Sequence, residues 1–333
     1  RTIVARGQVT SHDEGPVICV WDARVGSFDG EPELARIPFE KSSRGICALG
    51  FSYCGTMLTS VEMDNPHTVT VWDWRRGKKL GEGRGFNGEP IQVFGVEWNP
   101  YAVDGSGEFI TYGRKHIKKW SEAGRAWSSA SMSFGKQKMQ NVHSVVYLPR
   151  KASGTVLVAA GCSDGAILVF KERNAIKSIA AHAAGPQVIG EGGTKTYTGL
   201  RCMTVTEDER TLVTGGADGM VVRWDVADGG LSEESRLGEP LAVSPPYAGS
   251  SGGKQRPTAL RALDCKPESD TMVIGTGGCD IFEATPSGCE VLIFGHNADL
   301  YFIAWHPTKP DVFATACESA RVSIWDAGSR DMS

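Results

Sequence analysis

Short apolar runs recur along the whole chain, and many of them end on a large aromatic residue that is often followed by aspartate. Before each such run lies a turn cluster rich in Gly, Asp and Ser, and before the turn lies another apolar run. Short apolar runs separated by turns of this kind predict strands joined in tight hairpins. The aromatic endings are Trp21, Trp72, Trp120, Phe170, Trp224, Phe282 and Trp325.

The aromatic endings repeat at a regular interval, with successive separations of 51, 48, 50, 54, 58 and 43 residues. A third alternating run lies upstream of the later hairpins, as at Ile46–Phe51 and Leu200–Val205, and a short outer strand would bring each unit to four strands. One such unit cannot bury both of its faces, whereas several arranged radially bury them against each other. Trp-Asp endings at this period therefore predict an all-β chain, a seven-bladed WD40-type β-propeller with four-stranded antiparallel blades.

The predicted propeller is a single domain over residues 1–327 and leaves a tail at 328–333. Its first blade lacks a first strand and its last stops after Trp325-Asp326 without an outer strand, so ring closure is expected to use segments absent from this sequence. Residues 229–257 run acidic and then Pro-, Ser- and Gly-rich, which predicts a flexible insertion. The predicted units are approximately 1–40, 41–85, 86–130, 131–181, 182–240, 241–293 and 294–327.

One unit contains all four members of a polar network that resembles the WD-repeat tetrad: His182, Thr214, Asp218 and Trp224. A buried imidazole and carboxylate must find partners or cost several kcal/mol of desolvation. We therefore expect the set to fix the hairpin turn to the loop before the first strand. The equivalent residues of the last unit are His296, Thr315 and Trp325.

The overall charge and hydropathy exclude two classes of partner. The chain has 35 Lys and Arg against 39 Asp and Glu, a formal charge of -4, which gives no broad positive field for nucleic acid. No apolar run approaches the roughly 18 to 20 residues needed to cross a bilayer. We expect neither nucleic acid nor a membrane as partner.

The sequence contains no catalytic or metal-binding set. The nine cysteines include no C-x-x-C pair and the seven histidines have no metal-ligand spacing, so we expect no metal, no cofactor and no enzyme. Gly161–Gly165 fits G-x-S-x-G, but strands on both sides indicate a turn rather than a nucleophile elbow. Gly190–Thr196 lacks the Gly that precedes Lys in a phosphate-binding loop and is expected to be flexible. Cys47 and Cys202 alternate with apolar neighbours, which favours core thiols.

Two basic groups remain as candidate contact sites for a partner. The first follows the third strand of its unit and the second surrounds the inner hairpin of the next unit, so propeller topology places them on opposite faces. They are interpreted either as solvated loop charge or as contacts for an acidic protein surface. The groups are Arg75, Arg76, Lys78 and Lys79, and Arg114 and Lys115 with Lys118 and Lys119.

Several longer segments are specific to one family. They are Ile3–Gln8 followed by Val20–Ala23, Val71–Gly77 with its Trp-Asp-Trp, Gly113–Trp120 with Gly-x-x-His-Ile-x-x-Trp, and Gly295-His296 through Trp305–Pro307 to Trp325-Asp326. In their order and spacing the chain resembles the WD-repeat region of echinoderm microtubule-associated protein-like proteins, over Thr2–Ala327. The resemblance implies the first of two tandem atypical propellers, with a short hydrophobic motif before it and a second propeller after it.

The resemblance also implies a function. It points to a non-catalytic protein-interaction module in the cytoplasm, at the microtubule cytoskeleton, that binds tubulin, microtubules or associated proteins through propeller loops. The alternative is a general WD-repeat scaffold that recruits signalling proteins to the cytoskeleton without itself contacting tubulin. A third reading, an enzyme that uses a propeller channel, has no acid-base or metal set to support it.

Overall fold

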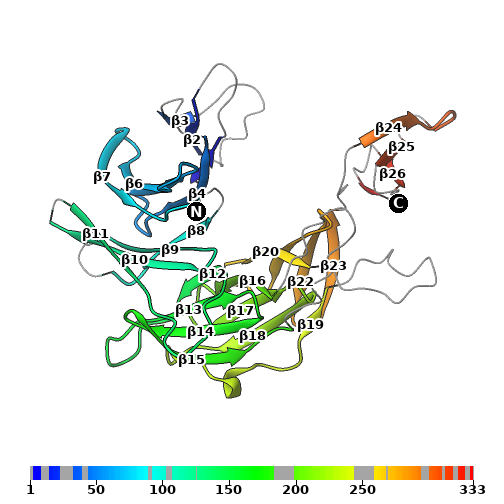
Figure 1. The fold of residues 1–333 in the computed structure, drawn as a ribbon. Coiled ribbons are helices and arrows are strands. Elements are labelled where there is room, and N and C mark those ends of the chain that lie inside the picture. Colours follow the sequence, from blue (N-terminus) through cyan, green and yellow to red (C-terminus); the bar gives the residue numbers. More distant parts are fainter. Residues whose placement is uncertain are drawn as a thin grey trace. The chain divides into compact units, whose positions relative to one another are not determined.

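Antiparallel β-sheet makes up nearly all of the regular structure in the computed structural model of the chain (Figure 1). Within the described residues the strands form seven sheets, one of three strands and six of four. The residues described are 3–8, 15–22, 33–39, 44–88, 92–102, 107–124, 126–183, 199–243, 259–267, 269–293, 300–309, 312–317, 322–326 and 331–332.

The chain divides into two compact units, Arg1–Ala180 with Val226–Leu231 and Ala181–Asp225 with Ser232–Ser333. The first unit holds four sheets in chain order. Their strands are β1 (Ile3–Gly7), β2 (Val17–Asp22) and β3 (Glu33–Pro38); β4 (Ile46–Phe51), β5 (Met57–Glu62), β6 (Thr68–Asp73) and β7 (Lys78–Arg84); β8 (Val93–Trp98), β9 (Glu108–Gly113), β10 (His116–Ala123) and β11 (Ala126–Ser131); and β12 (Val142–Tyr147), β13 (Leu157–Cys162), β14 (Ala166–Lys171) and β15 (Asn174–Ala180).

The second compact unit holds three sheets, again formed by consecutive strands. They are β16 (Leu200–Val205), β17 (Thr211–Gly216), β18 (Met220–Asp225) and β19 (Leu241–Ala242); β20 (Leu260–Cys265), β21 (Met272–Thr276), β22 (Ile281–Thr285) and β23 (Gly288–Ile293); and β24 (Leu300–Trp305), β25 (Val312–Cys317), β26 (Val322–Asp326) and β27 (Asp331–Met332). A short 3-10 helix, η1 (Glu233–Ser235), lies between β18 and β19.

In the sheets β4–β7 and β12–β15 the second and third strands are buried at most positions, whereas the fourth strands are largely exposed. The inner strands of the sheet β20–β23 instead alternate between buried and more exposed residues. In β6 the four residues Val69 to Trp72 are all buried, while β7 is exposed at most positions. This difference explains the sequence pattern, because strands covered on both sides read as continuous apolar runs and edge strands do not. The aromatic endings lie on the third strand of each four-stranded sheet, and Trp21 lies on β2, the middle strand of the first sheet.

A β-bulge recurs near the start of the first strand of every four-stranded sheet. The pairing with the second strand shifts between Ile46 and Ala48 in β4, and at the equivalent place in β8, β12, β16, β20 and β24. A bulge adds a residue and bends the strand, and it is a built feature when it repeats. Its recurrence shows that the sheets are copies of one unit.

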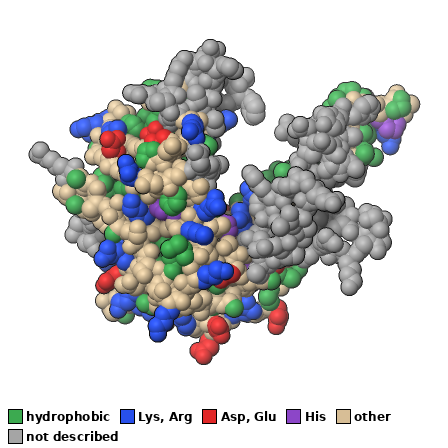
Figure 2. All heavy atoms as spheres, viewed as in Figure 1, with side chains coloured by type: hydrophobic (Ala, Val, Ile, Leu, Met, Phe, Trp, Pro, Cys, Tyr) green, Lys and Arg blue, Asp and Glu red, His purple; other side chains and the backbone are tan. Residues whose placement is uncertain are grey.

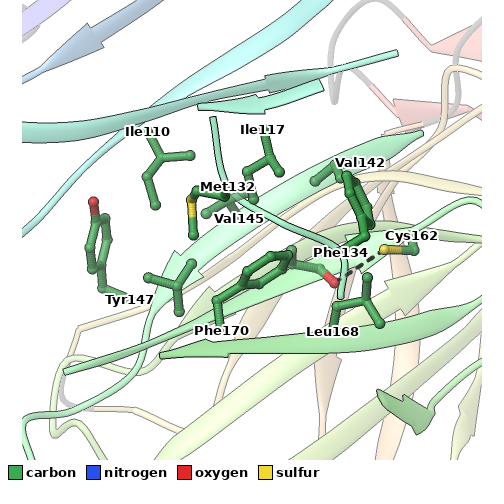
Figure 3. Packing of buried hydrophobic residues seen from close by; sticks show 12 residues of the cluster. Ile110, Ile117, Met132, Phe134, Val142, Val145, Tyr147, Cys162, Leu168 and Phe170 are labelled. Atoms are coloured by element: carbon green, nitrogen blue, oxygen red, sulfur yellow. Dashed lines mark hydrogen bonds between the residues drawn. The ribbon is translucent and has the colours of Figure 1, made fainter. Parts of the chain in front are cut away.

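The hydrophobic core lies between consecutive sheets rather than within one. One cluster joins Ile18 and Val20 of β2 with Leu58 and Trp72 of the next sheet. The cluster in Figure 3 joins the sheet β8–β11 with the sheet β12–β15, and the latter contributes Val145, Cys162 and Phe170. In the second compact unit a further cluster joins sheets β16–β19 and β20–β23. Within each compact unit, the sheets joined by these clusters therefore bury apolar faces against each other, as the repeat pattern predicts.

The first sheet has three strands, as expected, but the last sheet differs from the expectation. It gains a short fourth strand because Asp331 and Met332 pair with Asp326 and Trp325. A strand of two residues carries no periodicity of its own, so the sequence pattern could not reveal it.

The predicted insertion at 229–257 also differs where the structure describes it. Residues 229–243 contain η1 and β19, and β19 pairs with β18 as the outer strand of the fifth sheet. Val243 is fully buried and donates its amide to the Gly219 carbonyl oxygen at 2.8 Å. This apolar side chain anchors the segment to the sheet. Residues 244–258 lie outside the described residues.

Candidate functional site

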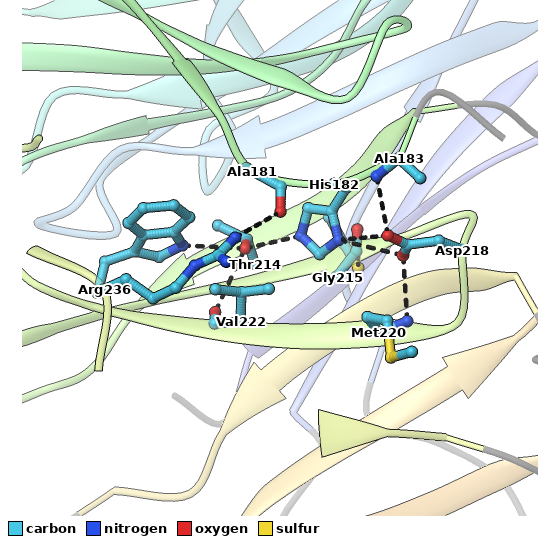
Figure 4. A network of polar contacts seen from close by, with 11 residues as sticks. Ala181, His182, Ala183, Thr214, Gly215, Asp218, Met220, Val222 and Arg236 are labelled. Carbon is cyan, nitrogen blue, oxygen red and sulfur yellow. Dashed lines mark hydrogen bonds and ion pairs between the residues drawn. The ribbon is translucent and has the colours of Figure 1, made fainter. Parts of the chain in front are cut away.

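The predicted tetrad of the fifth sheet forms one connected network (Figure 4). The Nδ1 atom of His182 lies 3.1 Å from Oδ1 of Asp218, and its Nε2 atom lies 2.9 Å from Oγ1 of Thr214. The indole nitrogen of Trp224 donates to the same Thr214 oxygen at 3.1 Å. Thr214 and Trp224 are fully buried. The loop before β16, the strand β17, the hairpin turn and the strand β18 are thereby joined.

The network has a consistent direction. With the His182 proton on Nδ1, the imidazole donates to Asp218 and its Nε2 atom accepts from the Thr214 hydroxyl, which in turn accepts from Trp224. Burial raises the pKa of Asp218, but the hydrogen bond from His182, its electrostatic attraction and the amides of Ala183 and Met220 outweigh burial, so the pKa of Asp218 is lowered. Asp218 stays ionised, and its carboxylate accepts the hydrogen bonds that hold the hairpin turn.

The same indole-to-hydroxyl bond recurs in three other sheets. Trp72 donates to Ser60 at 2.9 Å, Trp120 to Thr111 at 3.0 Å, and Trp325 to Thr315 at 2.7 Å. In each case the hydroxyl belongs to the second strand. It lies two positions after the residue that pairs with the tryptophan in the sheet register. The remaining residue proposed for the last sheet, His296, lies outside the described residues.

In two sheets a residue at another position, or of another type, takes the role of the tetrad histidine, and the sequence analysis did not identify either residue. In the third sheet His116, at the start of β10, supplies the imidazole, with Nε2 at 2.9 Å from Oγ1 of Thr111. In the fourth sheet the amide of Gln140 bonds Asp164 of the hairpin turn at 2.8 Å and also accepts from its backbone N–H. A Gln just before a first strand, paired with an Asp in the turn, was the signal available in the sequence.

Two of the four cations of the first basic group form ion pairs with nearby carboxylates. Arg76 forms an ion pair with Asp73 at 3.2 Å and Lys79 with Glu82 at 2.6 Å. Arg75 lies over the ring of Trp74 at 4.3 Å and donates to the Gly55 carbonyl oxygen. Exposed pairs of this kind contribute little stability. Lys78 lies beside them at the start of β7 and is exposed.

The members of the second basic group have different surroundings in the structure. Lys119 forms an ion pair with Glu108 at 2.6 Å, while Arg114 and Lys115 are exposed in the β9–β10 turn. Lys115 and Lys118 line a hollow of about 300 Å³ together with Arg84. Figure 2 shows Lys and Arg side chains scattered over the drawn face rather than gathered in one field. Arg84 lies 30 positions upstream of Arg114, so no sequence pattern groups it with these residues.

The residues searched for catalysis serve structural roles wherever the structure describes them. Gly161–Gly165 spans the end of β13 and a tight turn into β14, which confirms the turn reading. Burial raises the pKa of Cys47 and of Cys202 to about 12, so both are protonated thiols at neutral pH. Within the described residues no group of three or more His, Cys, Asp or Glu could hold a metal ion, and no helix could span a membrane. Gly190–Thr196 lies outside these residues.

Comparison with the profiles of known protein families identifies the family of this chain. The profile of the echinoderm microtubule-associated protein first β-propeller matches residues 1–241. The chain belongs to this family. A second profile, that of the WD domain or G-β repeat, matches residues 288–326 of this chain, which include β23 and the first three strands of the last sheet.

Curated relatives of the EMAP-family chain are similar along almost its whole length. Echinoderm microtubule-associated protein-like 4 of Xenopus laevis is 27% identical over 338 residues, which cover 97% of this chain and 32% of the relative. The 77 kDa echinoderm microtubule-associated protein of Strongylocentrotus purpuratus is 28% identical, over 97% of this chain and 41% of the relative. The chain thus spans about a third to two-fifths of the length of these relatives.

Solved structures establish the fold of the EMAP-family chain. The β-propeller domain of Cps50 (Swd1) from Myceliophteria thermophila matches with a TM-score of 0.60 and 17% identity, over 98% of this chain and 93% of the other. The computationally designed Ika8 protein matches with a TM-score of 0.54 and 17% identity, over 98% and 81%. The seven sheets are therefore the blades of a WD40-type β-propeller, which confirms the predicted fold class.

Proposed function

We propose that the chain is a non-catalytic protein-interaction module of a microtubule-associated protein, which binds tubulin, microtubules or their associated proteins through propeller loop surfaces. Its proposed location is the cytoplasm, on the microtubule cytoskeleton. The observation that carries the proposal is the match of the EMAP first-propeller profile to residues 1–241. A second propeller and a preceding hydrophobic motif of the same protein are expected to act with it.

The roles of the polar side chains support a non-catalytic module. The groups most suited to proton transfer in the fifth blade, His182 and Asp218, are occupied by a network that fixes a hairpin. Cys47 and Cys202 hydrogen-bond to backbone carbonyl oxygens within their own sheets. Such groups stabilise the blades, and a partner is left to contact the loops and the exposed charges.

A second candidate function is a scaffold that recruits signalling proteins to the cytoskeleton without itself contacting tubulin. The pairing of two cations of the first basic group favours it, because Arg76 and Lys79 already face Asp73 and Glu82. Charges that are paired within one strand hairpin attract an acidic surface less strongly than free ones. Tubulin would then bind elsewhere in the full-length protein.

Co-sedimentation with microtubules, together with gel filtration with soluble tubulin, tests the proposal. The full-length protein and a form with this propeller and its natural flanking segments would be measured side by side at increasing salt. Binding by both forms, weaker at higher ionic strength, is expected. Binding by the full-length protein alone would favour the scaffold. If the full-length protein bound neither polymer nor soluble tubulin, the main proposal would be wrong.

A further inference from the structure

A hollow in the first compact unit combines positive charge with an apolar wall. It lies where β7 ends, beside the β9–β10 hairpin and the loop that joins β11 to β12. We propose that this hollow, called here the basic hollow, docks an acidic peptide segment of a partner protein. One apolar side chain of the peptide enters the hollow, and its flanking carboxylates face the cations.

The charge around the basic hollow is of one sign. Arg84, Lys115 and Lys118 line it, and no carboxylate is among its described lining residues. The ammonium of Lys118 donates to the backbone oxygen of Arg84 at 2.7 Å rather than to an acid, and it lies 5.0 Å from the ring of Trp120. Burial and the nearby Arg84 charge lower the pKa of Lys118. An arriving carboxylate would relieve this repulsion.

The apolar part of the basic hollow has a fixed floor and an exposed rim. Met132 and Phe134 are buried and belong to the core cluster of Figure 3. Phe86 packs edge-on against His116, with ring centroids 5.5 Å apart. Met139, by contrast, is 57% exposed. A flexible thioether at the rim of a firm apolar floor suits contact with an apolar side chain of varied shape.

The size and setting of the basic hollow favour a peptide. Its volume of about 300 Å³ is at the lower end of roughly 300–1,000 Å³ typical of ligand pockets, so it admits a side chain rather than a large cofactor. Lys136 and Lys138, both exposed, lie in the same loop as Met139 and extend the positive rim. The chain as a whole has a net charge of -4, so this local excess of positive charge is complementary to an acidic segment.

This inference rests on the proposed function, because it places a partner contact on the chain, and it is tested separately. The probe is a fluorescent synthetic peptide with one central Leu flanked on both sides by Glu. Its binding to the full-length protein is measured by fluorescence anisotropy. Control peptides carry Gln in place of Glu, or Gly in place of Leu. We expect each control to bind about fivefold to tenfold more weakly.

Three substitutions measure separately how local charge, apolar contact and net charge contribute to peptide affinity. Lys115→Glu reverses a cation of the basic hollow, and Met139→Ser removes the exposed apolar rim without a change of charge. Lys177→Glu, on exposed β15 outside the hollow, is the matched control for net charge. We expect Lys115→Glu to weaken peptide binding roughly tenfold and Met139→Ser about threefold to tenfold, whereas Lys177→Glu changes it less than twofold.

The possible results either support or overturn the basic hollow. Three results would overturn the proposal. Lys177→Glu would weaken peptide binding as much as Lys115→Glu, the Gly peptide would bind as tightly as the Leu peptide, or a single-stranded DNA oligonucleotide of equal charge would compete with the peptide. Absence of binding to the wild-type protein would do the same. Co-sedimentation with microtubules in parallel separates the two proposals. Tubulin binding without peptide binding contradicts only the hollow, and peptide binding with the expected variant pattern but without tubulin binding contradicts only the tubulin assignment.

Discussion

At the scale of single residues, one hydroxyl group on the second strand decides whether a blade's tryptophan is satisfied. Thr214, Thr111, Ser60 and Thr315 all accept from an indole N–H. Buried polar atoms are costly when unpaired, so the pair of residue types must occur together. The sequence revealed this pairing only in the units that also carried a tetrad histidine.

Replacement of Thr214 tests the value of the tetrad. Thr214→Val leaves the Trp224 N–H and one nitrogen of His182 without their buried partner, and we expect a loss of about 1 to 3 kcal/mol. Thr59→Val is the matched control, because Thr59 is fully buried and its hydroxyl has no hydrogen-bond partner within the described residues. That control should be neutral or slightly stabilising. Hydrogen exchange of the β17 and β18 amides measures the effect locally.

The opposite ranking would contradict the role of the network. If Thr59→Val cost as much as Thr214→Val, volume and packing, rather than hydrogen bonding, would explain both losses.

His116 predicts a dependence of stability on pH. Burial, Lys118 and His67 lower the pKa of His116 from 6.5 to about 4. Between these values the unfolded chain binds more protons than the folded one, so stability is expected to fall as the pH falls from 6.5 towards 4. The limiting loss is about 3 kcal/mol. Thermal unfolding at a series of pH values measures it, and His116→Gln should flatten the decline. An imidazole NMR titration with a midpoint above 6.5 would contradict this account.

At the scale of the element, close approach of an outer strand to the next blade requires small residues. A Cβ at Gly83 of β7 would lie 2.7 Å from Cζ3 of Trp120, which is buried and stacked on Phe109. Gly288 of β23 has nothing within 4 Å of the equivalent point. The two glycines look alike in the sequence but have different structural roles.

Alanine substitutions distinguish these two glycines. We expect Gly83→Ala to cost about 1 to 3 kcal/mol by overpacking against a ring that cannot easily move. Gly288→Ala should be neutral or stabilising by up to about 1 kcal/mol, since it reduces the entropy of the unfolded chain in a strand with room for a methyl group. Chemical denaturation of both variants, followed by tryptophan fluorescence, gives the comparison. Equal losses would show that the Trp120 contact is not limiting.

The strands that the sequence could predict are those with a periodicity of their own. The inner hairpins follow from apolar runs around Gly-Asp turns, such as the turn at Gly165. The outer strands β19 and β27 have only two residues each, and their neighbours in the sheet select them. Lys115 was a candidate from the start, whereas Arg84 and Met139 join it only through the fold, from separate blades and loops. The short outer strands and the lining of the hollow are both determined by contacts in the folded chain rather than by a periodicity in the sequence.

At the scale of the whole molecule, the chain has a net negative charge while the basic hollow is positive. Association with an acidic partner therefore depends on local rather than overall attraction. Contacts between exposed charges are screened within about 8 to 10 Å at physiological salt. We expect partner affinity to fall steadily as salt is raised from low to physiological concentration, and co-sedimentation across a salt series measures this. Affinity that does not depend on salt would indicate an apolar interface instead.

The most direct test of the central claim is the affinity of the full-length protein for microtubules and soluble tubulin, compared among the wild type, Lys115→Glu and Lys177→Glu. The account predicts binding by the wild type, a severalfold weaker affinity for Lys115→Glu and no change for Lys177→Glu. Wild-type protein that binds neither microtubules nor tubulin would contradict the claim that this propeller belongs to a tubulin-binding module.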